Sequence, residues 1–211
     1  MALPADKLIT INDRGARVAT TFGSVTSGGA NMVFIKKLTA SSSSTLSFVD
    51  GTSSVVLDNT YKEYLFTFNN LHSSDTGQFG FQGNAAGGSG FDETMTTTNF
   101  RAIHSEAGSD PELSYVAGED QAQGTGLTLI AQSQDTDNDS SLSGYLHLFN
   151  PSSTTFVKHF ISRVTNMKSG DYVGQTFAAG YFNTTSAIDE IQFNYNSGNI
   201  DAGDICLYGI L

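Results

Sequence analysis

The sequence predicts an all-β fold, a jelly-roll-like antiparallel β-sandwich preceded by an extended N-terminal arm. The first observation is that apolar and polar residues alternate, as at Tyr64, Phe66 and Phe68, which is typical of half-buried strands. Second, no long segment repeats its apolar residues at the helical spacing of about 3.6 residues. Third, clusters of Gly, Asn, Asp and Ser separate the apolar segments, and such clusters form turns.

Residues 1–31 are expected to form the arm, and residues 32–211 the sandwich. The arm segment contains four glycines and shows little periodicity, so we expect it to order only against a partner. A frayed terminus is the alternative. Its apolar segment 8–11 is too short for the core of a secretion signal. The protein is therefore expected to begin its life in a cytoplasm.

The sandwich is predicted from short apolar segments between turn signals. Asp50-Gly51 predicts a hairpin between the second and third strands, and Asn150-Pro151 ends a later strand. Leu146 and Leu148 oppose Tyr145 and Phe149, so this strand is apolar on both faces and is expected to be central or to carry a subunit contact. Segments 83–90 and 132–143 are expected to be long loops. The expected strands are 32–38, 45–49, 55–57, 61–68, 78–82, 100–104, 127–131, 145–149, 155–164, 172–182, 188–195 and 205–210.

Composition excludes several classes of protein. One Cys excludes a disulfide scaffold and a Cys-rich zinc module, and the missing Cys–Trp–Cys pattern disfavours an immunoglobulin sandwich. A net charge of −11 without a basic cluster predicts no nucleic-acid binding. No apolar segment approaches the length of a membrane span, so no membrane insertion is expected.

The charge is uneven along the chain. Residues 1–70 sum to +1 and residues 71–211 to −12. This asymmetry suggests an orientation, in which the near-neutral start faces a partner and the acidic remainder faces solvent. A solvated acidic surface that only aids solubility is the alternative interpretation.

The segment around Asp135, Asp137 and Asp139 is the candidate metal site. Carboxylates at alternate loop positions are how many loops bind calcium. The EF-hand pattern fails, because Ser140 and Leu146 stand where that loop requires Gly and Glu. An exposed acidic hairpin loop is the alternative.

The residues predict no enzyme and no cofactor. The segment 87–91 (GGSGF) breaks the nucleophile-elbow pattern, and the four His residues lack metal-ligand spacing. Cys206, in an apolar strand, is expected to be a buried inert thiol. Adjacent carboxylates on a strand point to opposite faces, which weakens each pair as a catalytic dyad. These pairs are Asp92 with Glu93, Glu119 with Asp120, and Asp189 with Glu190.

Strands with apolar residues on both faces and eight Tyr residues predict a homo-oligomer, with a trimer as the first expectation. Tyr is favoured where one end of the side chain is buried and the other is wet, so a host-surface glycan is a second possible partner. The loops 83–93 and 132–143 would bind it, because the first is rich in glycine and the second is largely polar.

Three segments carry a resemblance: 36–74, 145–160 (YLHLFNPSSTTFVKHF) and 179–210, which closes with LYGI. In this order they resemble small virion-associated proteins of tailed bacteriophages, of the cyanophage and marine-phage type. The resemblance spans about 36–211. It implies a virion structural protein, either a capsid decoration or head fibre or a neck or tail appendage, and carries over no active-site residue. Residues 1–31 would then anchor the protein to other virion proteins, in particles assembled in the host bacterial cytoplasm. A receptor- or glycan-binding module at a tail or fibre tip is the alternative.

Overall fold

Thirteen strands run through residues 32–211, the part of the chain that the computed structural model describes. The expected arm, residues 1–31, lies outside the described residues. Residues 31–211 group into one compact unit. The predicted all-β sandwich is confirmed, and every pairing between the described strands is antiparallel.

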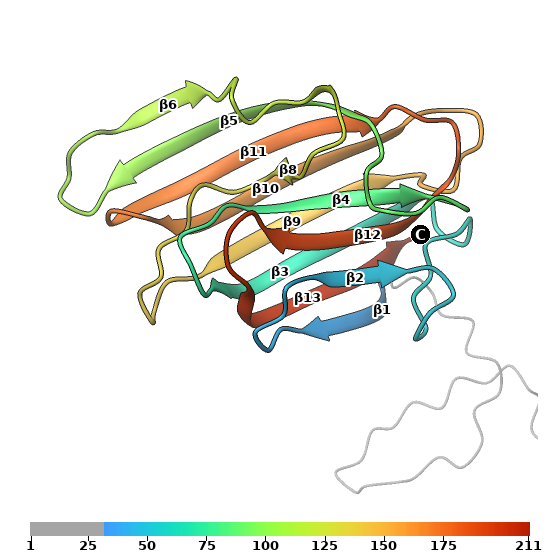
Figure 1. The fold of residues 1–211 in the computed structure, drawn as a ribbon, viewed down its shortest axis with the longest axis horizontal. Coiled ribbons are helices and arrows are strands. Elements are labelled where there is room, and N and C mark those ends of the chain that lie inside the picture. Colours follow the sequence, from blue (N-terminus) through green and yellow to red (C-terminus); the bar gives the residue numbers. More distant parts are fainter. Residues whose placement is uncertain (1–31) are drawn as a thin grey trace, which may run out of the picture. The chain divides into compact units, whose positions relative to one another are not determined.

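The larger layer is a nine-stranded sheet (Figure 1). Eight of its strands follow one another across the sheet, and the ninth, β7 (Ala122–Gly124), pairs with β5 beside β6. The order is β1 (Met32–Thr39), β13 (Ile200–Ile210), β3 (Glu63–Ser73), β9 (Leu142–Phe149), β10 (Lys158–Lys168), β11 (Tyr172–Phe182), β5 (Met95–Ser105) and β6 (Glu112–Tyr115).

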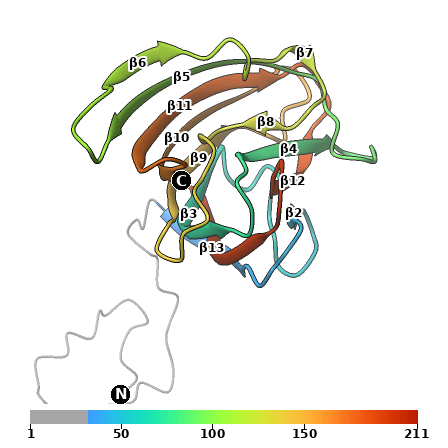
Figure 2. The same cartoon turned by 60° about the vertical axis from the view of Figure 1, so that its left-hand side comes forward.

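The smaller layer is a four-stranded sheet that covers one face of the larger one. Figure 2 shows the nine-stranded sheet bending round it, with β6, β5 and β11 arching beyond the smaller sheet. Its order is β2 (Leu46–Val49), β12 (Ile188–Tyr195), β4 (Phe79–Ala85) and β8 (Thr128–Leu129).

The chain repeatedly crosses from one sheet to the other. The strands β1 to β5 alternate between the larger and the smaller sheet, and β11, β12 and β13 do so again. Strands far apart in sequence therefore become neighbours: β13 pairs with both β1 and β3. This alternation is the jelly-roll character that the sequence predicted.

The core lies between the sheets and is largely aromatic. Phe193 of β12 is fully buried and contacts five other rings, at centroid distances between 5.3 and 6.3 Å. Aromatic rings at these separations gain offset-stacked or edge-to-face energy beyond simple burial. The five rings are Phe48, Phe66, Phe68, Phe79 and Phe81.

The outer face of the nine-stranded sheet, defined as the face turned away from the smaller sheet, has no second layer of described residues. Alternation along β10 shows the division: Phe160 and Val164 are buried, whereas Ile161 and Arg163 are exposed. Strand β9 is apolar on both faces, as expected, because Leu146 enters the core while Tyr145 points outward.

The structure corrects several expectations about individual elements. Residues 55–57 form no strand, because the backbone N–H of Leu57 donates to the Asp50 carboxylate instead of to a neighbouring strand. The side chains of Val55 and Leu57 are nevertheless buried in the core. The expected loop 83–90 begins too early, since β4 continues to Ala85 through its pairing with β12. Strands β6 and β7 were not expected, and both are short edge strands that need β5 as a template.

A bulge between β3 and β13 shapes one end of the sheet. The register shifts between Ala202 and Asp204, where Gly203 has φ +103° and Asn70 opposite has φ +49°. An extra residue in one strand increases the local twist and re-aims the neighbouring side chains. Here the re-aimed side chains include those of His72 and Asp201, which hold the loop described next.

Candidate functional site

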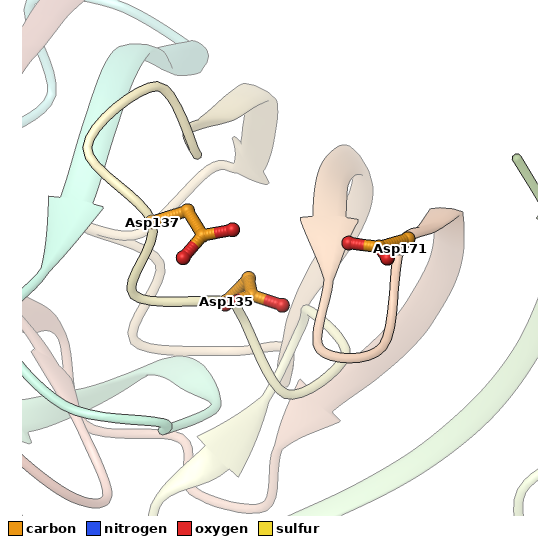
Figure 3. Close-up of side chains that lie close together, drawn as sticks. All are labelled: Asp135, Asp137 and Asp171. Atoms are coloured by element: carbon orange, nitrogen blue, oxygen red, sulfur yellow. The ribbon is translucent and has the colours of Figure 1, made fainter.

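The acidic loop 132–143 is the sequence-predicted site, and the structure changes its metal-ligand set. Carboxylate oxygens of Asp135 and Asp137 meet one of Asp171, all within 4.8 Å of one another (Figure 3). Asp171 stands in the turn between β10 and β11, far along the chain. Asp139 is not part of this group; it lines two hollows beside the loop.

The loop turns back on itself after Asp137, which separates Asp139 from the other two carboxylates. The backbone N–H of Ser140 donates to the carbonyl of Asp137 at 2.8 Å. The side chains of alternate residues share a face only where the chain is extended. The spacing of the three Asp residues therefore did not predict which of their carboxylates lie together.

Asp135 fixes the loop against the β10–β11 hairpin. Its carboxylate accepts the N–H of Thr136 at 2.7 Å and that of Gly170 at 3.2 Å. Its own N–H donates to the carbonyl of Met167 at 3.1 Å. Asp137 and Asp171 are exposed, so a cation at this cluster would bind a pre-positioned Asp135 and two solvated carboxylates.

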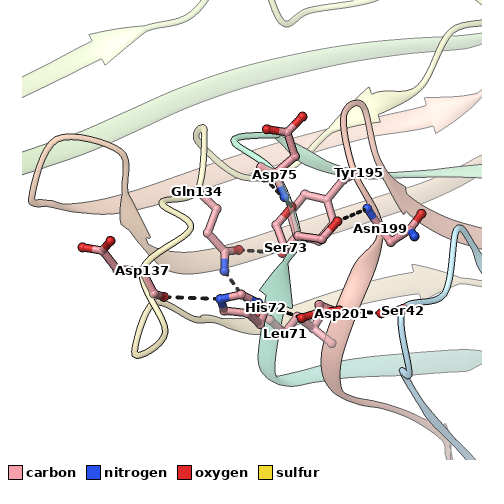
Figure 4. Close-up of polar contacts among 11 residues, drawn as sticks. Ser42, Leu71, His72, Ser73, Asp75, Gln134, Asp137, Tyr195, Asn199 and Asp201 are labelled. Atoms are coloured by element: carbon pink, nitrogen blue, oxygen red, sulfur yellow. Dashed lines mark hydrogen bonds and ion pairs between the residues drawn. The ribbon is translucent and has the colours of Figure 1, made fainter.

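A buried polar contact supports the loop from inside the sandwich (Figure 4). Gln134 is fully buried; its Oε1 accepts from the Tyr195 hydroxyl at 2.5 Å, and its Nε2 donates to the carbonyl of Leu71 at 3.0 Å. Burial raises the pKa of Tyr195 above its usual range, so the hydroxyl keeps its proton and remains a donor. Both polar atoms of the buried Gln134 side chain are therefore hydrogen-bonded, and these two bonds fix the start of the loop.

His72 of β3 holds the other side of the loop. Its Nε2 lies 3.3 Å from the carbonyl oxygen of Asp137, and its Nδ1 lies 3.7 Å from the carboxylate of Asp201 (Figure 4). Ser42 donates its hydroxyl to that same carboxylate at 2.6 Å. The loop is thus tied both to β3 and, through Asp201, to β13.

Two shallow hollows flank the loop. The first, of about 440 Å³, lies beside the β10–β11 hairpin and includes His104, Glu106 and Tyr172 in its wall. The second, of about 430 Å³, lies between the loop, β3 and β13. Asp139 and Ser141 line both hollows. Their walls are rich in carboxylate, hydroxyl and imidazole groups, which bind hydroxylated ligands by hydrogen bonds.

The other candidate loop, 83–93, lies at the opposite end of the sandwich. Loop 132–143 contacts the start of β4, where the N–H of Gln134 donates to the carbonyl of Gly77. The second loop leaves the far end of β4, after Ala85. The two loops therefore form no common site.

The three carboxylate pairs named from the sequence are spread over separate contacts. Glu93 accepts the N–H of Ala85 at 3.1 Å, Glu119 accepts from Gln78 at 2.6 Å, and Glu190 accepts from Asn84 at 3.2 Å. Each of these contacts joins neighbouring segments of the fold. The absence of catalytic activity stays a prediction.

Cys206 is buried, as expected from its apolar strand. His147 is half-buried on the outer face rather than in the core, and its Nε2 lies 3.0 Å from the carboxylate of Glu63. His159 is exposed near Tyr181 on the same face. These imidazoles contact neighbours within the sheet, and the acidic cluster of Figure 3 contains none of them.

Sequence reasoning missed Asp171 and the Gln134–Tyr195 contact. The turn signal Ser169-Gly170-Asp171 between two predicted strands marked a hairpin. Nothing in it indicated that loop 132–143 would fold against that hairpin, because the contact joins segments that only the tertiary fold brings together.

The comparisons with known proteins add no family to these observations. Searches against protein-family models, curated proteins and solved structures gave no match. Within residues 32–211, no helix is long and apolar enough to cross a membrane.

Calcium binding at the loop stays a prediction, now with different ligands. We expect calcium to raise the Tm of the protein, because a ligand that binds only the folded state stabilises it. Asp171→Asn should abolish the rise, since it removes one of the three convergent carboxylates. Asp139→Asn should keep it. Thermal melts with calcium and with a chelator measure both; loss of the effect in Asp139→Asn alone would contradict the assignment.

Proposed function

We propose that this chain is a non-enzymatic structural component of a bacteriophage virion, a capsid decoration or head fibre or a neck or tail appendage. Residues 1–31 anchor it to other virion proteins, and the sandwich projects from the particle. The protein assembles in the host bacterial cytoplasm and ends in the virion. The resemblance of segments within 36–211 to small phage virion proteins suggests this class.

The observation that carries the proposal is the outer face of the nine-stranded sheet. Among the described residues, eight of the ten exposed large hydrophobic side chains stand on strands of this sheet. Exposed apolar patches of this kind mark protein–protein contact sites. The eight are Met32, Phe34, Phe100, Leu113, Tyr115, Tyr145, Ile161 and Val173.

The distribution of charge supports the same role. Most carboxylates of the described residues lie in loops and turns, including Asp135, Asp137 and Asp171 at one end of the sheet. The contact face is thus apolar while its surroundings are acidic, a combination that keeps a particle protein soluble before assembly.

Removing residues 1–31 should abolish incorporation into particles without unfolding the sandwich. The buried hydrophobic cluster is built from residues between Ala40 and Leu207, so the truncated chain keeps it intact. We expect an unchanged Tm and strand-type circular dichroism, together with loss of the protein from purified particles. Quantitative immunoblotting of the particles measures the loss.

A matched control replaces residues 1–31 by a Gly/Ser linker of equal length. This chain should also fail to join the particle, which separates the chemistry of the arm from its length. Normal incorporation of the truncated chain would show that the anchor lies elsewhere in the protein.

A glycan-binding module is the second candidate, favoured by the two polar hollows beside loop 132–143. Their carboxylates, among them Glu106, Asp139 and Asp201, suit neutral sugars and repel phosphorylated or sialylated ones. Binding of the intact chain to neutral bacterial oligosaccharides on a glycan array would support this candidate, and retention on none of them would leave the structural role.

A further inference from the structure

We propose that residues 108–126, here called the flap, open and close as a unit while the rest of the sandwich stays folded. The flap contains β6, β7 and the turns around them, and it pairs along the edge of β5 that β11 leaves free (Figure 2). This conformational device goes beyond the proposed virion role and does not depend on it.

The flap lacks the apolar anchoring of the rest of the sandwich. None of the described residues 96–129 belongs to the buried hydrophobic cluster, which includes Met95 before this stretch and Ile130 after it. The two large apolar side chains of β6, Leu113 and Tyr115, are 75% and 61% exposed. Buried apolar area is the main source of stability in a fold, so a segment without it is among the first to open.

Backbone hydrogen bonds at the edge of the larger sheet hold the flap closed instead. The N–H of Val116 donates to the carbonyl of Asn99 at 2.9 Å, and the N–H of Thr97 donates to the carbonyl of Gln121 at 2.9 Å. Strands β6 and β7 are only four and three residues long. Water replaces such short pairing at an outer edge more readily than pairing inside a sheet.

Glu119 fastens the flap to the body of the sandwich. Its carboxylate accepts from Gln78 Nε2 at 2.6 Å and from Gln132 Nε2 at 3.4 Å. Burial raises the pKa of Glu119, which means that the closed flap disfavours the ionised carboxylate. At neutral pH the open flap solvates this group better, and that offsets part of what the two hydrogen bonds contribute.

Two further contacts fasten the β7 end of the flap, and both are exposed to solvent. Gln82 donates to the carbonyl of Thr125, and Asn183 donates to the side-chain carbonyl of Gln123. Exposed hydrogen bonds exchange one partner for water and contribute little net stability. Polar contacts therefore hold the flap along its whole length.

Closing the flap leaves several polar atoms unpaired. Arg101 Nε on β5 and Gln121 Oε1 on the flap are buried and have no hydrogen-bond partner among the described residues. The same holds for Asn99 Oδ1 and Asp120 Oδ1. A buried polar atom without a partner is destabilising, and water reaches these atoms once the flap lifts. The open state gains hydrogen bonds that the closed state lacks, which brings the two states closer in free energy.

Glycines stand at both ends of the flap. Gly108 has φ +75°, and a Cβ built at Gly108 or at Gly126 would meet none of the described atoms within 4 Å. Backbone with open space around it can change its torsion angles without a clash, as a hinge requires. Opening about these ends would uncover the edge of β5 together with the guanidinium of Arg101.

The test is amide hydrogen exchange of the full chain, followed by NMR at several low denaturant concentrations. We expect the amides of Thr97, Val116 and Gln121 to be protected about 100-fold less than those of β10, or weaker still. Their exchange should barely respond to denaturant, because opening the flap exposes little surface, whereas exchange in β10 should speed up steeply.

Thr98 is an internal control within the same strand. Adjacent amides of a strand point to opposite sides, so the N–H of Thr98 faces β11 while that of Thr97 faces the flap. Thr98 should therefore be protected like β10, although its neighbour Thr97 exchanges with the flap.

Three variants separate flap opening from unfolding of the sandwich. Glu119→Ala should speed exchange at Val116 by about tenfold, whereas Glu106→Ala should not, because it removes the same charge from an exposed side chain without a hydrogen bond to the described residues. Phe193→Leu weakens the aromatic core, whose contacts the open flap keeps. It should speed exchange in β10 by about tenfold and leave Val116 unchanged.

Equal protection of Thr97 and Thr98 would overturn the inference, and so would steep denaturant dependence at Val116 or equal responses of Val116 and β10 to Phe193→Leu. Each of these results would mean that the flap opens only when the sandwich unfolds. Identical exchange at Val116 in Glu119→Ala and Glu106→Ala would refute the fastening by Glu119. Particle incorporation enters none of these measurements, so the inference and the proposed virion role fail separately.

Discussion

Replacing Phe193 with Ala should lower the free energy of unfolding by about 3–5 kcal/mol, the range for large aromatic residues in a core. Phe193 is fully buried on β12, in the middle of the smaller sheet, and its ring touches five other aromatic rings. The lost ring leaves a cavity that the two strand-locked sheets cannot close by collapsing. In a chain of this size such a loss lowers the Tm by about 6–20 °C.

Thermal and denaturant unfolding measure this effect, and Phe156→Ala is its control. Phe156 is exposed on a turn, so its truncation should change stability by no more than about 0.5 kcal/mol. Equal effects of the two truncations would show that the aromatic cluster is not the centre of the core.

Replacing Gly203 with Ala should cost about 2–4 kcal/mol, through backbone strain and overpacking. At φ +103° an L side chain is strained, and a Cβ there would clash with the carbonyl oxygen of Asn70 and lie 2.7 Å from Leu71 Cα. Because these are backbone atoms, no rotamer change relieves the contact. The bulge would have to open, which would pull Asp201 away from His72.

Gly118→Ala serves as the control, since nothing lies within 4 Å of the position that its new methyl group would take, and its φ is not in the left-handed region. It should be neutral in a denaturant titration. Full wild-type stability of Gly203→Ala would mean that the bulge accepts a side chain and does not constrain the acidic loop.

The alternation of apolar residues predicted the fold class and most strands. The expected strands 172–182 and 188–195 match β11 and β12, because both are long, contain several β-branched and aromatic residues and are bounded by turn residues. Where apolar residues were few, prediction failed: β6 and β7 exist because β5 offers an edge to pair with, and their own residues carry little strand signal.

The segment 55–57 fails for the opposite reason. Val55 and Leu57 are buried, as their apolar character indicated, but the Asp50 carboxylate takes the N–H that a ladder would have used. A side chain that competes for backbone hydrogen bonds can cancel a strand without changing burial.

The acidic loop shows the same limit at the site. Its composition marked it as a candidate, and Asp135 and Asp137 do converge. The third carboxylate is Asp171 instead of Asp139, because one turn at Ser140 and one hairpin between β10 and β11 decide which side chains meet.

By itself, the sequence determined the alternation of apolar and polar residues along strands such as β3, the antiparallel sandwich class and the acidic character of the loops. These follow from the two-residue period and from charge, which are local properties. The tertiary structure alone decided that exposed apolar residues of six strands lie on one outer face, and that the carboxylates of Asp135, Asp137 and Asp171 lie close together. Both depend on strand order and register, which are set by long-range pairing and the packing of the shared core rather than by neighbouring residues.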